Sequence, residues 1–235
     1  MKYVLFDLDG TLLPMDQDYF TVRFFETLAN YMEKRGYERK TFQKALLAGI
    51  TAEKNNNGKT LNGTLFYEAI TECLGESFLQ DKDYFDNFNF TEFNDVKQYV
   101  GFTPRAAETV KKVKAAGAKL ILASNPIFAD EGQKARMRWA GVDPDDFDYI
   151  TSAENSTYCK PKTEYYQEIL TKIGAKPQNC VMIGNDTGDD PPSINAGIQF
   201  FLLTDCLINT KNIDVNTFTN GNYDALNAYL DDFLG

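Results

Sequence analysis

The chain has 235 residues, 43% of them hydrophobic, and carries a net charge of −10. This length and apolar content allow one large domain, or a core domain with a smaller companion, and argue against disorder. An acidic surface repels nucleic-acid phosphates, and the short basic run at 111–114 indicates a solvated helix face, so we expect no nucleic-acid partner. The sequence has no histidine, so acid–base chemistry must fall to carboxylates, lysine, tyrosine, cysteine or a metal-bound water.

The cysteines and the apolar runs bear on where the protein works. The four cysteines are scattered and form no CxxC pair, which predicts reduced thiols rather than disulfides or a zinc site. The first residues lead directly into a strand-like segment, which is not the pattern of a signal peptide, and no apolar run approaches the length of a membrane span. We therefore expect a cytoplasmic protein with no membrane partner and no obligate protein partner.

The first element is an apolar run at 3–9, YVLFDLD, which predicts a buried parallel strand ending in Asp7 and Asp9. Unpaired carboxylates are costly in such a strand, so the two acids need a partner, and a metal ion supplies one. Side chains at positions i and i+2 share a face of an extended strand, which allows both acids to be directed at one ligand. Gly10 then lets the backbone turn sharply, and Thr11 offers a hydroxyl group.

Residues 15–99 differ in character, because they are rich in Phe and Tyr and contain no strand-like run. Apolar residues at helical spacing predict helices at 16–36, 38–50 and 60–75, around a polar loop at 53–59. We interpret the segment as a helical insertion in the connection after the first strand. Such an insertion is tolerable, because the entropy cost of closing a loop grows slowly with its length.

Beyond residue 100, strands and helices alternate. The predicted strands lie at 118–125, 180–186 and 198–205, with a weaker one at 147–153. The predicted helices run from Thr103-Pro104 to Gly117, over 131–141, and from a cap at Thr163 to Gly174. This alternation predicts an α/β fold with a parallel sheet, in which ligands bind at the carboxyl ends of the strands.

Polar residues at four places carry a recognisable pattern. The motif FDLDGT follows the first strand, LILASN ends at Ser124-Asn125, YCKPKTEYY contains Lys160, and VMIGNDTGDD contains Asp186 and Asp190. In this order, and with three of the four at strand ends, the motifs resemble the signatures of the haloacid dehalogenase superfamily. The resemblance implies a Rossmann-like catalytic core of parallel strands flanked by helices.

The resemblance also implies a division of the chain and a set of catalytic roles. The core would comprise 1–14 and 100–235, and 15–99 would form a smaller helical cap domain. Asp7 would be the nucleophile that forms an aspartyl-phosphate, and Asp9 would protonate the leaving oxygen and later activate water. Lys160 would add positive charge beside the nucleophile and the phosphoryl group.

The family pattern assigns further residues to the substrate and to the metal. Phosphoryl oxygens would be bound by Thr11, Ser124 and the amide of Asn125. The expected cofactor is Mg²⁺, which prefers oxygen ligands, although Mn²⁺ suits the same ligands. Its ligands would come from Asp7, Asp9 (through the main-chain carbonyl), Asp186 and Asp190, with Asp189 as a competing assignment for Asp190.

The second aspartate distinguishes the expected reaction. Haloacid dehalogenases need no second acid to protonate a leaving oxygen, so Asp9 favours Mg²⁺-dependent hydrolysis of a small phosphate monoester. Two alternatives stay open: a phosphomutase with the same core residues, and a non-catalytic binding protein on this fold. The expected partner is a small phosphorylated metabolite, and the candidate contacts from the cap are Arg23, Lys54, Asn56 and Lys59.

Overall fold

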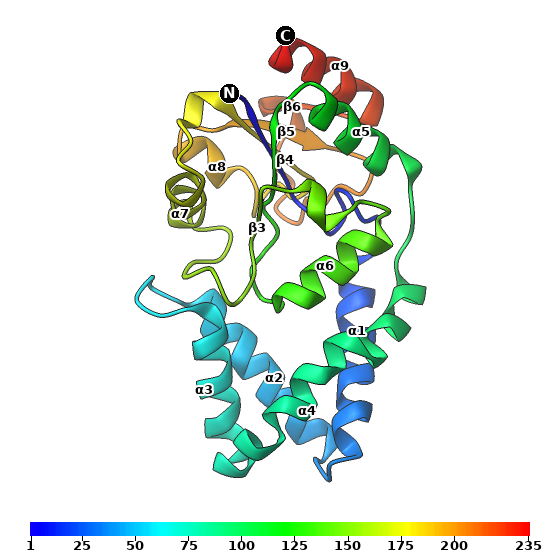
Figure 1. The fold of residues 1–235 in the computed structure, drawn as a ribbon, viewed down its shortest axis with the longest axis vertical. Helices are drawn as coiled ribbons and strands as arrows, with labels where there is room; N and C mark the ends of the chain where they lie inside the picture. The colour runs from blue at the N-terminus through cyan, green and yellow to red at the C-terminus, as the bar shows by residue number, and fades with distance from the viewer.

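The computed structural model describes all residues, 1–235, and is built around one six-stranded parallel sheet (Figure 1). The strand order is β3-β2-β1-β4-β5-β6, so β1 lies between β2 and β4 in the middle of the sheet. The strands are β1 (Tyr3–Phe6), β2 (Lys119–Leu122), β3 (Tyr149–Ile150), β4 (Cys180–Gly184), β5 (Gln199–Leu203) and β6 (Thr219–Gly221). This arrangement confirms the predicted α/β fold with a parallel sheet.

Alternate residues of the buried strands enter two separate apolar clusters. Val4 and Phe6 of β1 belong to the larger cluster, whereas Leu5 belongs to the smaller one on the opposite face. The larger cluster is covered by helices α5 (Pro104–Ala115), α6 (Asp130–Trp139) and α9 (Tyr223–Leu234). The smaller cluster is covered by α7 (Thr163–Ile173), beside which the short α8 (Pro192–Asn195) packs. Both faces of the central strands are therefore dry, which explains why they are continuous apolar runs.

Helices form at the three places in the segment after β1 where apolar spacing predicts them, and further helical turns follow up to residue 99. The segment contains α1 (Gln17–Glu33), α2 (Arg39–Lys54), α3 (Asn62–Leu74) and α4 (Lys82–Asn87), followed by 3₁₀ turns up to Tyr99. Figure 1 shows these helices as a group at one end of the molecule, beyond the edge of the sheet. None of the helices in the structure is both long and apolar enough to cross a membrane.

Aromatic side chains join this helical group to the sheet and its flanking helices. Phe24 of α1 lies 5.1 Å, ring centre to ring centre, from Phe128 in the loop after β2. Phe93 lies 4.8 Å from Trp139 of α6. The two parts thus share one apolar cluster, and the division into a core (1–14 and 100–235) and a cap (15–99) stays a prediction.

The structure corrects the predicted course of the chain after the first strand. Strand pairing ends at Phe6, not at residue 9, and the following residues form a tight turn in which the amides of Thr11 and Leu13 donate to the carbonyl of Leu8. Gly10 adopts a φ of +81°, a conformation that glycine tolerates without strain. The two aspartates are therefore brought together by a turn, and the argument from a shared strand face is wrong.

Other element ends shift by a few residues. The expected helix start is confirmed at Thr103, whose side chain accepts a hydrogen bond from the amide of Arg105, and Gly174 ends α7 with a φ of +63°. Thr163 is the first residue of α7 rather than its cap, which is Lys162. The edge strand β6 was not expected from the sequence, because TNG at 219–221 is short and polar.

Candidate active site

A buried ion cluster lies at the carboxyl ends of β1 and β4. The ammonium group of Lys160 lies 2.8 Å from Oδ1 of Asp7 and 2.7 Å from Oδ1 of Asp190, and all three side chains are almost fully buried. Asp7 directly follows β1, and its amide donates to the carbonyl of Ile183 in β4. Three residues that are far apart in the sequence, and that the sequence analysis singled out, therefore meet at one point.

The charges of this cluster perturb one another. Burial raises the pKa of Asp7 to about 7, against the lowering effect of Lys160, and the nearby Asp190 and Asp9 raise it further. Burial alone would lower the pKa of Lys160, but the charges of Asp190 and Asp7 outweigh it and hold that pKa well above its usual value. The lysine therefore stays cationic, and the carboxylates around it carry an excess of negative charge.

Thr11 contacts the carboxylate of Asp7, the expected nucleophile, and is itself held by Asn185. The hydroxyl of Thr11 lies 3.2 Å from Oδ2 of Asp7 and 3.0 Å from Oδ1 of Asn185, and the side-chain amide of Asn185 donates to the carbonyl of Cys206. Thr11 does not reach the wall of the cavity in front of Asp7. The structure thus gives Thr11 a role in orienting Asp7, and its predicted contact with substrate stays a prediction.

Asp9 has a partner that sequence reasoning missed. Arg136 of α6 is fully buried, stacks over the ring of Phe128 at 3.9 Å, and forms an ion pair with Oδ2 of Asp9. Its other terminal nitrogen donates to Oε1 of Gln133, while Oδ1 of Asp9 is buried without a hydrogen-bond partner. Nothing in the spacing of α6 marks Arg136 as buried, because it stands among other basic residues in KARMR.

Ser124 and Asn125, after β2, also reach the site. Both line the same cavity as Asp7 and Asp9. The carbonyl of Ser124 accepts hydrogen bonds from the hydroxyls of Thr151 and Tyr165, each at 2.7 Å, which fixes the loop. Oδ1 of Asn125 is buried and has no partner. The predicted strand-end residues are therefore together, with an unsatisfied polar atom among them.

Asp186, Asp189 and Asp190, in the loop after β4, make different contacts. Oδ1 of Asp190 binds Lys160, and Oδ2 accepts from the amide of Asp186 at 3.0 Å. A side-chain carbon on Gly184 would lie 2.1 Å from that second oxygen, so the close approach requires glycine. Asp189 binds no cation in the structure, although its carbonyl accepts a hydrogen bond from Tyr166. Asp190, not Asp189, therefore holds the lysine.

These positions test whether the residues suit a divalent cation. No three His, Cys, Asp or Glu side chains are grouped so as to hold a metal ion by themselves. Mg²⁺, however, is commonly bound by only one or two carboxylates, with water and phosphate oxygens completing its shell. Asp186 has one oxygen without a hydrogen-bond partner, and the excess negative charge around Asp7 suits a cation. Asp186 therefore offers one free oxygen to such an ion, whereas both oxygens of Asp7 and both of Asp190 already accept hydrogen bonds. Binding of the ion by Asp7, Asp186 or Asp190 stays a prediction.

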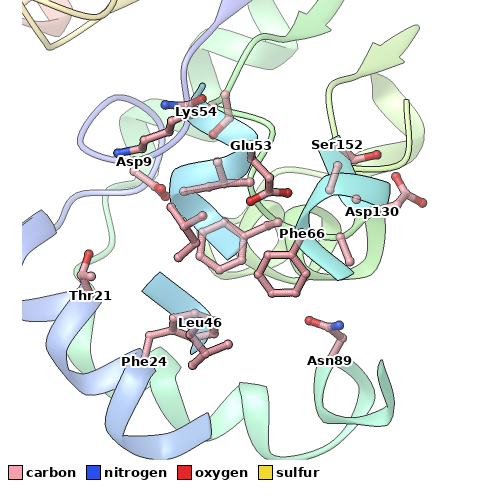
Figure 2. A pocket seen from close by; sticks show the side chains of 18 of the residues that line it. Asp9, Thr21, Phe24, Leu46, Glu53, Lys54, Phe66, Asn89, Asp130 and Ser152 are labelled. Atoms are coloured by element: carbon pink, nitrogen blue, oxygen red, sulfur yellow. The ribbon is translucent and has the colours of Figure 1, made fainter. Parts of the chain in front are cut away.

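A cavity of about 1140 Å³ opens in front of these residues, between the strand ends and the helical group. Its walls include Asp7, Lys160 and Asp186 together with side chains of α1, α2 and α3. Figure 2 shows Asp9 on one side of the cavity, with Phe24 of α1, Leu46 of α2 and Phe66 of α3 among the other lining side chains. Of the four side chains expected to contact substrate from the helical segment, only Lys54 lines this cavity. Arg23 pairs with Glu26, and Lys59 does not reach the wall. The side-chain amide of Asn56 donates to the carbonyl of Thr60 and to Oδ1 of Asn62, the first residue of α3.

The sequence matches one known protein family and several of its members. The model of the haloacid dehalogenase-like hydrolases matches residues 1–197. The chain belongs to this family. Pyrophosphatase PpaX of Bacillus cereus is 26% identical over 83% of the chain and 80% of its own length, and glyceraldehyde 3-phosphate phosphatase of Methanothermobacter thermautotrophicus is 26% identical over 86% and 85%.

The fold has close counterparts among solved structures. A HAD phosphatase from Thermococcus onnurineus superposes with a TM-score of 0.60 over 98% of both chains, at 17% identity. This likeness confirms the Rossmann-like α/β fold that the motifs imply. Family membership and the phosphatases among its relatives identify the chain as an enzyme of the phosphatase class.

Proposed function

We propose that the chain is a Mg²⁺-dependent phosphatase that hydrolyses a small phosphate monoester through a phosphorylated Asp7. The observation that carries the proposal is the cluster in which Lys160 binds both Asp7 and Asp190 beside the open cavity. A lysine held there by two carboxylates keeps its position and charge without a ligand. Charge fixed in advance in this way is the main protein contribution to phosphoryl transfer.

Two steps follow from the residues at the site. An oxygen of Asp7 attacks phosphorus, the bond from phosphorus to the ester oxygen breaks, and Asp9 gives its proton to that leaving oxygen. In the second step Asp9 takes a proton from water, the water oxygen attacks phosphorus, and the bond to Asp7 breaks to release inorganic phosphate. Thr11 orients Asp7, and Arg136 holds Asp9 at one oxygen, leaving the other for proton transfer.

The substrate-binding and metal-binding groups are assigned by position. Ser124 and the amide of Asn125 would bind phosphoryl oxygens, because both residues reach the cavity wall near Asp7. Asp7, Asp186 and the main-chain carbonyl of Asp9 would hold Mg²⁺. A bound Mg²⁺ supplies charge that offsets repulsion between the carboxylates and an incoming phosphate.

The cavity has room for a small phosphate ester. A space of about 1140 Å³ roofed by helices suits a small metabolite. The relatives named for pyrophosphate and for glyceraldehyde 3-phosphate point to small phosphorylated compounds as well. The acidic composition gives no basic surface for nucleic acid.

The proposal is tested with purified protein, Mg²⁺ and p-nitrophenyl phosphate. We expect Asp7→Asn to lower the rate at least about a thousandfold, because the amide is a far weaker nucleophile. Asp83→Asn, at an exposed position of α4, is the matched control and should keep full activity. Full turnover by Asp7→Asn would rule out this mechanism. Release of inorganic phosphate, rather than an isomerised sugar phosphate, separates a hydrolase from a mutase.

A further inference from the structure

Glu53, at the end of α2, is a buried acid without any partner. Its side chain is fully buried, and neither carboxyl oxygen has a hydrogen-bond donor within reach. A buried polar group without a partner is expensive, and a buried charge without a partner is more so. Neither helix geometry nor apolar packing calls for an acid at this position.

The carboxyl group of Glu53 belongs to the wall of the cavity in front of Asp7. Figure 2 shows it projecting from α2 into the pocket, above the ring of Phe66. The hydroxyl of Ser152, on the facing loop, lines the same cavity and is also buried without a partner. That loop is held against the start of α3, where the amide of Gly63 donates to the carbonyl of Ala153 at 2.8 Å. Two unsatisfied polar groups therefore face one space.

The charges of the wall indicate what this space accepts. Eleven carboxylates line the cavity against three lysines, so a further anionic group on a ligand would be repelled. Lys160 is neutralised by Asp7 and Asp190, and Lys82 by Asp86, which leaves Lys54 as the one unpaired cation. Lys54 is exposed, and Figure 2 shows its side chain on the Asp9 side of the view, turned away from Phe66.

We propose that Glu53 determines substrate specificity by binding an amino group on the alcohol part of the phosphate ester, with the hydroxyl of Ser152 as a second acceptor. The inference rests on the proposed function, because it places the phosphoryl end of the same molecule at Asp7. An ammonium group supplies the positive charge and the hydrogen-bond donors that Glu53 lacks in the free enzyme. An enzyme site built to pair with a polar group strongly rejects analogues that lack it.

The test uses three series of alkyl phosphates with two to six carbons, ending in an amino, a hydroxyl or a carboxyl group. For the wild type we expect the amino series to exceed the hydroxyl series at least tenfold in kcat/KM at the best chain length, and the carboxyl series to be poorest. In Glu53→Gln the ratio of kcat/KM for amino esters to kcat/KM for hydroxyl esters should fall to near one. Glu72→Gln, the same change at an exposed position of α3, should leave the ratio unchanged.

A binding measurement separates this inference from the phosphatase proposal. Calorimetry with ω-aminoalkyl and ω-hydroxyalkyl phosphonates, which lack the ester bond, reports the same preference without turnover. If no ester is hydrolysed but the wild type binds the amino phosphonate at least tenfold tighter than Glu53→Gln does, the inference stands and the proposed reaction fails. A preference for the hydroxyl or carboxyl series, or an amino preference that survives Glu53→Gln, overturns the role of Glu53.

Discussion

Replacing Glu53 with glutamine should stabilise the protein, by an amount that depends on pH. Burial, with a smaller effect of the nearby Glu154, raises the pKa of Glu53 from 4.5 to about 10. A carboxyl whose pKa is raised by folding keeps its proton in the folded state and loses it in the unfolded state. Its contribution to folding is therefore most favourable below pH 4.5 and declines steadily as the pH rises toward 10.

The size of the effect follows from the shift. Each pH unit above 4.5 costs about 1.4 kcal/mol of unfolding free energy, so at pH 7 Glu53 destabilises the protein by about 3 kcal/mol. Glutamine has nearly the same shape and no charge to lose. Glu53→Gln should therefore raise the free energy of unfolding by about 3 kcal/mol at pH 7, and by no more than about 1 kcal/mol at pH 5.

Urea denaturation followed by circular dichroism at pH 5, 6, 7 and 8 measures this difference directly. Glu72→Gln is the control, because Glu72 lies exposed on α3 and makes no ion pair, and its effect should stay within about 0.5 kcal/mol at every pH. A gain in Glu53→Gln that does not grow with pH would refute the reasoning, and so would a loss of stability at pH 8. Either outcome would mean that Glu53 is ionised and compensated in the folded protein.

Four further changes probe the site. Lys160→Met leaves the buried carboxylates of Asp7 and Asp190 without a cation. The turnover of p-nitrophenyl phosphate should fall at least about a thousandfold, and the free energy of unfolding, measured by urea denaturation, should fall by about 3–5 kcal/mol. Arg136→Lys keeps the positive charge but loses the planar guanidinium group that binds both Asp9 and Gln133. Steady-state kinetics should therefore show a kcat about tenfold to a hundredfold lower, with KM little changed. A rise in KM alone would count against a positioning role for Arg136. Chelation of divalent ions should abolish turnover, and added Mg²⁺ should restore it. Cys159→Ala should keep activity within about twofold, because burial raises the pKa of that thiol to about 12 and leaves it unreactive; inactivity of a folded variant would contradict this.

The sequence predicts the parts of this fold that depend on local pattern. Continuous apolar runs identify β1, β2, β4 and β5, because strands buried on both faces need no polar residues. The edge strand β6 escapes notice, since three polar residues at the margin of a sheet carry no such pattern. The sequence predicts the turn at Gly10 but not its effect on the position of Asp9, because strand length depends on the pairing of neighbouring strands.

The sequence likewise predicts some residues of the candidate site and misses others. Asp7, Lys160 and Asp190 were found because their motifs stand in a known order, and the parallel sheet brings strand ends together. Arg136 and Glu53 were missed, because their significance lies in burial and in a partner that is distant or absent. Arg136 meets Asp9 across 127 positions of sequence, and a helical pattern does not reveal which of several basic residues turns inward.

Three buried ionisable side chains, Lys160, Arg136 and Glu53, differ in whether the chain supplies them with a partner. Lys160 forms ion pairs with two acids, and Arg136 forms one with Asp9. The side chains at the proposed phosphate-binding end of the cavity are therefore held in place before any ligand binds. Glu53, at the end of the cavity formed by the helices, has no hydrogen-bond partner for either carboxyl oxygen. A buried carboxyl group that costs stability at neutral pH and has no hydrogen-bond partner in the chain is best explained by a partner that arrives from outside the chain. The cavity therefore has paired charges at the strand ends and an unpartnered carboxyl group under the helices. We attribute the first to the chemistry common to the family and the second to the proposed choice of substrate by this chain.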